Sequence, residues 1–343
     1  MSKKLFDFVI GNPPYQEESK GNNANDRPVY NYFYDALFSV SDVVELITPA
    51  RFLFNSGSTP KDWNQKMLND EHFKILKYEQ NSSNVFQNTD IKGGVCVGYR
   101  NCKKDFGSIG VFVSYDELNS IKNKVQSCST KSLMDIMTSR GIYRFSDLAY
   151  KEQPDELSKT ADPRISASAF ERMKTLFTDD KPNDEDHAYI QMYGIVKNKR
   201  MYKWFRRDYL KDVSNLYKYK VLVPKANGSG AIGEVLSTPL IGTPLIGFTE
   251  TFISVGEVDT KEEAECILKY VKTKFARTML GILKVTQNNS KQVWKYVPLQ
   301  DFTSNSDIDW SKSIPEIDQQ LYKKYGLDEN EIEFIETHVK EMV

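Results

Sequence analysis

The stretch that decides the fold lies at the start of the chain, where Leu5–Ile10 (LFDFVI) runs directly into Gly11–Tyr15 (GNPPY). The apolar run is too short for a helix, and the prolines end it abruptly. A short, nearly continuous apolar run is typical of a strand in a parallel sheet, which is buried on both faces. We therefore predict a buried strand here, with the GNPPY loop at its carboxyl end.

The residues that follow alternate between helical and strand patterns. Residues 27–39 (RPVYNYFYDALFS) carry apolar side chains at helical spacing, and residues 42–54 (DVVELITPARFLF) indicate a strand, a turn and a short helix. Lys74–Glu79 is a further strand candidate. Glycines favour a hairpin through residues 91–101 (IKGGVCVGYRN) and 109–115 (IGVFVSY). This alternation predicts an α/β domain.

Further along, the composition divides the chain of 343 residues into more parts. Residues 116–163 are polar and rich in Ser and Lys, without a sustained period, which favours a connection between domains. Within residues 164–312, Thr260 and Glu263 form a capping-box pattern at the start of a helical stretch that extends to Lys284. Residues 313–343 are acidic and helical in pattern. The length of the chain suggests about two domains of roughly 150 residues each.

The overall composition excludes several classes of protein. Lys and Arg number 46 against 47 Asp and Glu, and 19 Tyr, 19 Phe and 4 Trp are ample for a folded core rather than a disordered chain. The four cysteines form no CxxC pair, so we expect no structural metal and reduced thiols. No apolar run approaches the length of a membrane span, and we expect a cytoplasmic protein. By itself, the balanced charge argues weakly against nucleic acid as a partner.

The NPPY motif carries chemistry that suits an amino group. Because Pro13 and Pro14 stiffen the loop, the Asn12 side chain and the Pro13 carbonyl can act as two acceptors at a set separation. Accepting both hydrogens of an adenine N6 amine draws its nitrogen toward a tetrahedral geometry and frees its lone pair. Tyr15 offers a flat ring for a flipped base. The alternative is that NPPY is only a turn, since Asn-Pro and Pro-Pro are strong loop signals.

The strand and motif together, FDFVIGNPPYQ, resemble those of the N6-adenine DNA methyltransferases of restriction-modification systems, in the Eco57I-like and TaqI-like group with the gamma order of motifs. The resemblance covers nearly the whole chain. It is also carried by RPVYNYFYDAL (27–37), ITPARFLF (47–54), NVFQNTDIKGGVCVGYRN (84–101), YKVLVPKANGSGAIGE (219–234), the segment 252–302 and IDQQLYKKYGLDENEIEFIE (317–336).

The resemblance implies an α/β fold made of a partial Rossmann-like methyltransferase sheet and an α+β target-recognition domain. Residues 1–115 would be the later half of the catalytic domain, 116–163 a connecting region, 164–312 the target-recognition domain and 313–343 a C-terminal helical segment. It implies S-adenosylmethionine as cofactor, no metal and double-stranded DNA as partner. The implied catalytic residues are Asn12, Pro13, Pro14 and Tyr15, of which Asn12 and Pro13 would also form part of the cofactor site.

The usual cofactor-binding start of such enzymes is not found before the NPPY strand. In the gamma order, a strand, a glycine-rich turn and an acidic residue precede that motif, and there is no room for them upstream of Leu5. Gly228–Gly233 (GSGAIG) fits the G-x-G-x-x-G pattern, which requires a helix directly after it. Because Pro239 and Pro244 lie where that helix would run, we interpret the glycines as a loop or hairpin.

A basic, aromatic segment, Ile195–Lys225, is the candidate DNA-binding surface. It contains ten Lys and Arg against two Asp, a balance of 10 − 2 = +8, with Tyr, Trp and Phe between the charges. A solvated face over a small core would have the same composition, and the resemblance favours DNA. The cations that we expect to contact DNA are Lys197, Lys199, Arg200, Lys203, Arg206 and Arg207.

The function expected from the sequence is transfer of a methyl group from S-adenosylmethionine to a flipped adenine in DNA. A competing hypothesis is a DNA-binding specificity module without activity of its own, either truncated or one piece of a split enzyme. A separate polypeptide supplying the cofactor-binding half, or a cognate restriction endonuclease, would then be a partner. Methylation of RNA or of a protein glutamine is a third alternative, because NPPY also occurs in such enzymes.

Overall fold

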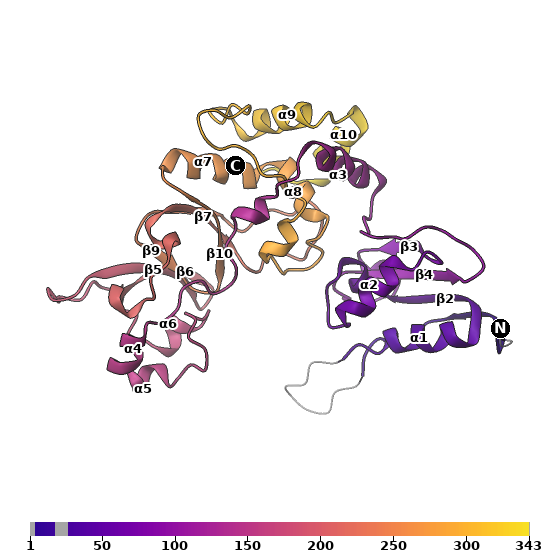
Figure 1. The fold of residues 1–343 in the computed structure, drawn as a ribbon, viewed down its shortest axis with the longest axis horizontal. Helices are drawn as coiled ribbons and strands as arrows, with labels where there is room; N and C mark the ends of the chain where they lie inside the picture. Colours follow the sequence, from indigo (N-terminus) through magenta and orange to yellow (C-terminus); the bar gives the residue numbers. More distant parts are fainter. Residues whose placement is uncertain (1–3, 18–26, 343) are drawn as a thin grey trace. The chain divides into compact units, whose positions relative to one another are not determined.

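The computed structural model describes residues 4–17 and 27–342. The chain divides into two compact units, Met1–Asp116 and Glu117–Val343, which Figure 1 colours indigo to violet and magenta to yellow. In the described residues, the first unit has one sheet and the second has two, and each unit has its own buried side chains. The protein is therefore a mixed α/β structure with several sheets.

The first unit is built on a sheet with the strand order β1-β2-β4-β3. β1 pairs with β2 in parallel, and β4 runs antiparallel to both β2 and β3. The predicted parallel pairing of the NPPY strand and the strand predicted from Lys74 are thus confirmed. The strands are β1 (Phe6–Gly11), β2 (Ser41–Pro49), β3 (Phe73–Glu79) and β4 (Val95–Asn101).

An aromatic cluster joins the helices of this unit to one face of the sheet. Tyr34 lies fully buried at its centre, with its ring centroid 5.9 Å from that of Phe73 and 6.0 Å from that of Trp63. Gly98 of β4 lies directly beneath, since a Cβ there would come within 2.4 Å of the Tyr34 hydroxyl.

The helices of the first unit are α1 (Tyr30–Val40), the short 3₁₀ turns η1 (Arg51–Phe54) and η2 (Ser82–Asn84), and α2 (Lys61–Asn69).

The expectation of a buried first strand is wrong for this chain. Phe6, Phe8 and Ile10, which alternate onto one face of β1, are 55%, 48% and 70% exposed. Among the described residues, β1 pairs only with β2. It is an edge strand, so its apolar side chains lack the neighbours that an interior position would supply.

The predicted hairpin is also not formed. Residues 91–101 contain β4, but residues 109–115 form no strand. The physical reason is that both edges of β4 are already paired, one with β2 and the other with β3. Phe112 instead packs against Phe54 and Tyr78, with ring centroids 5.5 and 5.4 Å away.

The second unit contains two sheets, ordered β6-β5-β9 and β10-β7-β8 within the described residues. β5 and β6 form an antiparallel hairpin whose turn, Lys197–Asn198, has positive φ at both residues, as a tight two-residue turn requires. The strands are β5 (Tyr189–Val196), β6 (Lys199–Arg206), β7 (Tyr219–Pro224), β8 (Leu240–Gly242), β9 (Ile246–Phe248) and β10 (Phe252–Val258).

Residues 116–163, expected to be a connection, contain helices and contribute Tyr143, Phe145 and Leu157 to the core of the second unit. The first of their helices spans 13 residues, but the others have only four to six, so no sustained period marks the segment as a whole in the sequence. They are α3 (Asp116–Cys128), η3 (Leu133–Ile136), α4 (Asp147–Glu152) and α5 (Pro154–Leu157), followed by α6 (Ala169–Arg172), η4 (Arg207–Tyr209) and η5 (Ser214–Tyr217).

Two helices near the C-terminus begin directly after a capping residue, Thr260 in one and Asp328 in the other. Thr260 and Glu263 form the expected capping box, but the helical stretch is interrupted at Thr273, whose side chain accepts a hydrogen bond from the Ala276 N–H and caps a second helix. Asp328 and Glu331 form another capping box. The elements are α7 (Lys261–Lys272), α8 (Lys274–Gly281), η6 (Lys291–Trp294), α9 (Ile314–Lys324) and α10 (Glu329–His338).

Candidate functional site

A pocket of about 740 Å³ lies in the first unit and includes the whole NPPY motif. Its walls come from the segments that follow β1 and β2, because the carboxyl ends of these two parallel strands meet at one edge of the sheet. The loop before β4 completes it. The lining residues are Asn12, Pro13, Pro14, Tyr15, Gln16, Pro28, Tyr30, Pro49, Arg51, Gly57, Ser58, Phe86, Thr89, Asp90 and Ile91.

The NPPY loop is held by backbone hydrogen bonds to the segment that leads into α1. The Val29 N–H donates to the Tyr15 carbonyl at 3.1 Å, and the Glu17 N–H donates to the Arg27 carbonyl at 2.9 Å. Within the motif, Pro13 is buried while Asn12 is exposed. The loop thus has a fixed base and presents its asparagine side chain at the pocket surface.

Tyr15 and Phe86 form two aromatic walls of this pocket. Their ring centroids lie 6.4 Å apart and the planes are inclined by 65°. Burial raises the pKa of Tyr15 to about 12, so the phenol is neutral at physiological pH. The pair can therefore offer one ring face and one ring edge to a flat, neutral ligand.

The loop that carries Phe86 is organised around a buried serine. The Ser82 hydroxyl donates to the Thr89 carbonyl at 3.1 Å and accepts from the Ile91 N–H at 2.8 Å. The Phe86 N–H donates to the Ser82 carbonyl at 2.8 Å. These bonds fold residues 82–91 into a compact loop, and they orient Phe86 toward Tyr15. Phe86 lies in the stretch 84–101 that carried the resemblance, but the sequence pattern did not single it out.

The glycine-rich stretch Gly228–Gly233 lies in the second unit and is a loop, as we interpreted it. Its backbone N–H groups are occupied by the carboxylate of Glu234, which accepts from the Ser229 N–H at 2.8 Å and from the Gly230 N–H at 3.1 Å. A Cβ at Gly230 would come within 2.1 Å of the Thr286 nitrogen, so the glycine permits close approach of a neighbouring segment. The pattern serves packing within the unit.

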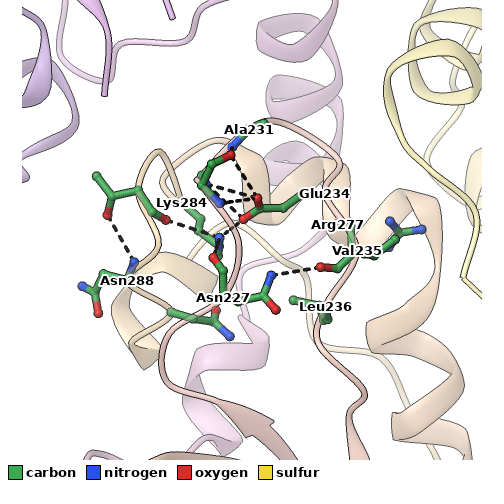
Figure 2. A network of polar contacts seen from close by, with 12 residues as sticks. Asn227, Ala231, Glu234, Val235, Leu236, Arg277, Lys284 and Asn288 are labelled. Carbon is green, nitrogen blue, oxygen red and sulfur yellow. Dashed lines mark hydrogen bonds and ion pairs between the residues drawn. The ribbon is translucent and has the colours of Figure 1, made fainter. Parts of the chain in front are cut away.

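Figure 2 shows how this loop is anchored, with Lys284 and Glu234 pointing toward each other at the centre of a polar network. Lys284 is 3% exposed, pairs with Glu234 and donates to the Asn227 carbonyl at 2.9 Å. The Asn227 side chain in turn donates to the Val235 carbonyl at 3.0 Å. Because its donors and acceptors are used internally, the loop is a structural element.

The cations expected to contact DNA differ in how they are used. Arg206 pairs with Glu152 and Asp208, and its side chain is only 14% exposed. Arg207 pairs with Asp212, and Lys203 with Asp179.

The other three expected cations, Lys197, Lys199 and Arg200, cluster at the turn of the β5–β6 hairpin, which projects from the rest of the second unit in Figure 1. Lys197 and Lys199 are exposed. Arg200 donates to the carbonyl oxygens of Ser237 and Thr238. Among the six cations expected to contact DNA, the exposed ones, Lys197 and Lys199, thus lie at the hairpin turn.

Two searches of the described residues concern other kinds of site. No group of three or more His, Cys, Asp or Glu side chains is arranged there to hold a metal ion. In the same ranges, 4–17 and 27–342, every helix falls short of the length and apolarity needed to cross a membrane.

A known protein family matches the segment that carries the NPPY motif and most of the residues that line the pocket. Residues 1–86 match the model of a family described as Eco57I restriction-modification methylase. An uncharacterized adenine-specific methylase from Mycoplasma pneumoniae (strain ATCC 29342 / M129 / Subtype 1) is 27% identical over 95 residues, which are 26% of this chain and 22% of that protein. The resemblance to restriction-modification methylases is therefore confirmed for this part of the chain.

Two solved structures are similar over most of the chain. The type IIG restriction endonuclease BpuSI covers 92% of this chain with a TM-score of 0.36 and 10% identity, and the match takes in 48% of that protein. The type IIL restriction-modification enzyme MmeI, solved in complex with DNA, covers 97% with a TM-score of 0.40 and 9% identity, and the match takes in 56% of it. The chain thus spans about half the length of these structures and about a fifth of the curated relative.

Proposed function

We propose that this protein is the amine-binding part of a DNA adenine N6-methyltransferase of a restriction-modification system. The observation that carries the proposal is the pocket at the carboxyl ends of β1 and β2, in which Asn12 and Pro13 lie beside the inclined rings of Tyr15 and Phe86. Its aromatic walls suit a flat base, and the motif supplies acceptors for an exocyclic amine. The family match over residues 1–86 supports the same function.

The residues of the pocket would act by orientation and polarisation. The Asn12 side-chain oxygen and the Pro13 carbonyl oxygen accept the two N6 hydrogens, so the nitrogen becomes more tetrahedral and its lone pair is less delocalised into the ring. Tyr15 stacks on the base and holds it outside the duplex. The amine loses its proton only after it has gained the methyl group, when it is a strong acid, so water can accept that proton. No general base is required.

S-adenosylmethionine would supply the methyl group as an electrophile when bound. Asn12 and Pro13 would form one side of the S-adenosylmethionine site, the side that faces the amine. The one glycine-rich turn that fits a cofactor pattern has its N–H groups bonded to Glu234. We therefore propose that the rest of the cofactor site comes from a further polypeptide segment, and we assign no step to the cofactor.

β1 is where such a segment would join. In our proposal, the β1-β2-β4-β3 sheet is the later half of a Rossmann-like methyltransferase sheet. Phe6, Phe8 and Ile10 remain exposed on β1, whose second edge has no partner strand in the ranges that the structure describes. A parallel strand added there would use the free backbone groups and cover apolar surface. The segment belongs either to a longer form of the chain or to a separate polypeptide.

The second unit would bind double-stranded DNA as a target-recognition domain. The accessible cations at the β5–β6 turn, Lys197 and Lys199, are the residues we expect to approach phosphates. Arg206 and Arg207, which are paired with Glu152, Asp208 and Asp212, would support the hairpin from within.

Transfer of tritium from methyl-labelled S-adenosylmethionine to plasmid DNA tests the proposal. The full chain is assayed beside Asn12→Ala and a matched exposed asparagine control in the same unit, Asn69→Ala. Incorporation that survives in the control and is lost in Asn12→Ala supports the enzyme. Incorporation that is unaffected by Asn12→Ala would contradict the assigned role of the motif.

The alternative function is a DNA-binding module without activity of its own, favoured by the free edge of β1. Retention of plasmid DNA without incorporation of tritium, and with no binding of 2′-deoxyadenosine that Asn12→Ala weakens, supports this alternative. Replacing the DNA by RNA or by a glutamine-containing protein in the same assay tests the remaining substrate classes.

A further inference from the structure

Arg51 lies at the same edge of the sheet as the NPPY motif, although it comes from a different segment. β2 ends at Pro49, and Arg51 is the first residue of η1. Because β1 and β2 are parallel, the segments after both strands open into the same pocket, and Arg51 lines it together with Asn12 and Tyr15. A permanently charged guanidinium therefore borders a pocket with aromatic walls.

The stem of Arg51 is held between two glycines that adopt positive φ. A Cβ at Gly57 would come within 3.1 Å of Arg51 Cδ, and one at Gly93 within 2.9 Å of Arg51 Cγ. The Nε–H donates to the Lys92 carbonyl oxygen at 2.5 Å. The stem is thus packed between two glycines and the Nε–H is hydrogen-bonded, so the position of the side chain is fixed before any ligand binds.

The charge of this guanidinium is not neutralised within the pocket. Asp90, the carboxylate among the lining residues, pairs with Lys92 at 2.6 Å. In the part of the chain that the structure describes, the Nη atoms of Arg51 have no hydrogen-bond or ion-pair partner.

We propose that Arg51 binds a phosphate of the nucleotide whose base enters the NPPY pocket. The proposal rests on the proposed function and names the contact that would position the target nucleotide. A nucleotide is a flat base joined through its sugar to a negatively charged phosphate. The pocket likewise combines aromatic rings with the two N–H₂ groups of a guanidinium whose position is already fixed. Arginine binds phosphate oxygens in this bidentate manner, which lysine cannot reproduce. Arg51 is a positioning residue in this scheme.

The test compares two probes that differ only in phosphate. Binding of 2′-deoxyadenosine and of 2′-deoxyadenosine 3′,5′-bisphosphate to the full chain is measured by ligand-observed NMR. We expect the bisphosphate to bind roughly tenfold or more tightly than the nucleoside, the range of a hydrogen bond to a charged group. In Arg51→Ala the bisphosphate should bind only slightly more tightly than the nucleoside, because the remaining cations attract it without a specific contact. Binding of the nucleoside itself should be unchanged.

Two further variants separate the specific contact from charge and folding. Lys77→Ala removes one exposed cation from the same unit and should keep the phosphate advantage. Arg51→Lys keeps the charge without the fork and should lie between wild type and Arg51→Ala, so it decides the question even if the alanine variant is unstable. Thermal unfolding of each variant is measured alongside.

The outcomes distinguish this inference from the proposed function. An Arg51→Ala variant that keeps the full phosphate advantage overturns the inference and leaves the adenine pocket standing. Binding of the bisphosphate through Arg51 with no binding of the nucleoside supports the anion site and overturns the adenine pocket. A loss confined to binding of S-adenosylmethionine would assign Arg51 to the carboxylate of that molecule and overturn the phosphate contact.

Discussion

The rings of Tyr15 and Phe86 meet at an angle of 65° with their centroids 6.4 Å apart, although 71 positions separate them in the sequence (86 − 15 = 71). One ring follows β1 and the other belongs to the loop before β4. Their meeting turns a strand-and-turn motif into a pocket, and the first two predictions concern this arrangement.

Replacing Tyr15 by Ala should weaken binding of 2′-deoxyadenosine by about 1–3 kcal/mol, the usual contribution of a base stacked on an aromatic ring. Tyr15→Phe should retain most of the affinity, because it keeps the ring. Ligand-observed NMR measures the affinities. Tyr32→Ala is a suitable control, since Tyr32 is 64% exposed on α1 of the same unit. An equal loss in both alanine variants would contradict the stacking role.

Ser82→Ala should lower the free energy of unfolding of the first unit by about 1–2 kcal/mol, because the Ile91 N–H and the Thr89 carbonyl lose a buried partner. It should also weaken nucleoside binding, as the loop that orients Phe86 loosens. Ser83→Ala, one residue later at an exposed position, should change neither quantity. Thermal unfolding and the same NMR titration give the two results. A stable Ser82→Ala chain with normal binding would show that the loop does not depend on this hydroxyl.

Lys284→Met should destabilise the second unit by about 3–5 kcal/mol, because it leaves the Glu234 carboxylate without its buried partner. The double variant Lys284→Met with Glu234→Gln should be less destabilised than the sum of the two single variants. Denaturant unfolding of the full chain measures these values. The exposed pair Lys261–Glu265 on α7 supplies the control, and its removal should cost less than about 0.5 kcal/mol. Additive effects at Lys284 and Glu234 would argue against coupling.

The second unit should become more stable as the pH rises from 7 to 9. Burial lowers the pKa of Lys220 from 10.5 to about 7, so over this range the unfolded chain holds a proton that the folded chain has released. The unfolded state binds more protons, and the free energy of unfolding rises with pH, by about 2 kcal/mol from this group. Urea unfolding at several pH values measures the rise, and Lys220→Met should remove it. An equal rise in both proteins would assign it to another group.

The double variant Lys197→Ala, Lys199→Ala should weaken binding to plasmid DNA and reduce its dependence on salt, by a slope of about 1 for each phosphate that is no longer neutralised. Arg206→Ala should instead lower stability by about 1 kcal/mol, since it breaks pairs with Glu152 and Asp208. Filter binding at several salt concentrations and thermal unfolding separate the two effects. Lys151→Ala, at an exposed position on α4, is the control for charge. An unchanged salt slope in the double variant would exclude the hairpin turn from the DNA interface.

Much of the local structure was predictable, because its causes lie within a few residues. The prolines of NPPY end a short apolar run, so the strand and its loop could be placed from the sequence. The capping boxes at Thr260 and Asp328 mark helix starts through bonds that span three residues. The hairpin predicted through residues 109–115 failed because strand propensity does not reveal that both edges of β4 are already occupied.

By itself, the sequence determined the chemistry of the motif, since the residue types of Asn12 to Tyr15 specify acceptors and a ring wherever the loop lies. Only the tertiary structure decided which side chains join them. It brought Arg51 and Phe86 to the same pocket, filled the glycine turn with the carboxylate of Glu234, and left β1 at an edge. The physical reason is that these contacts depend on how strands far apart in the sequence pair with each other. A local pattern of residues does not specify that pairing.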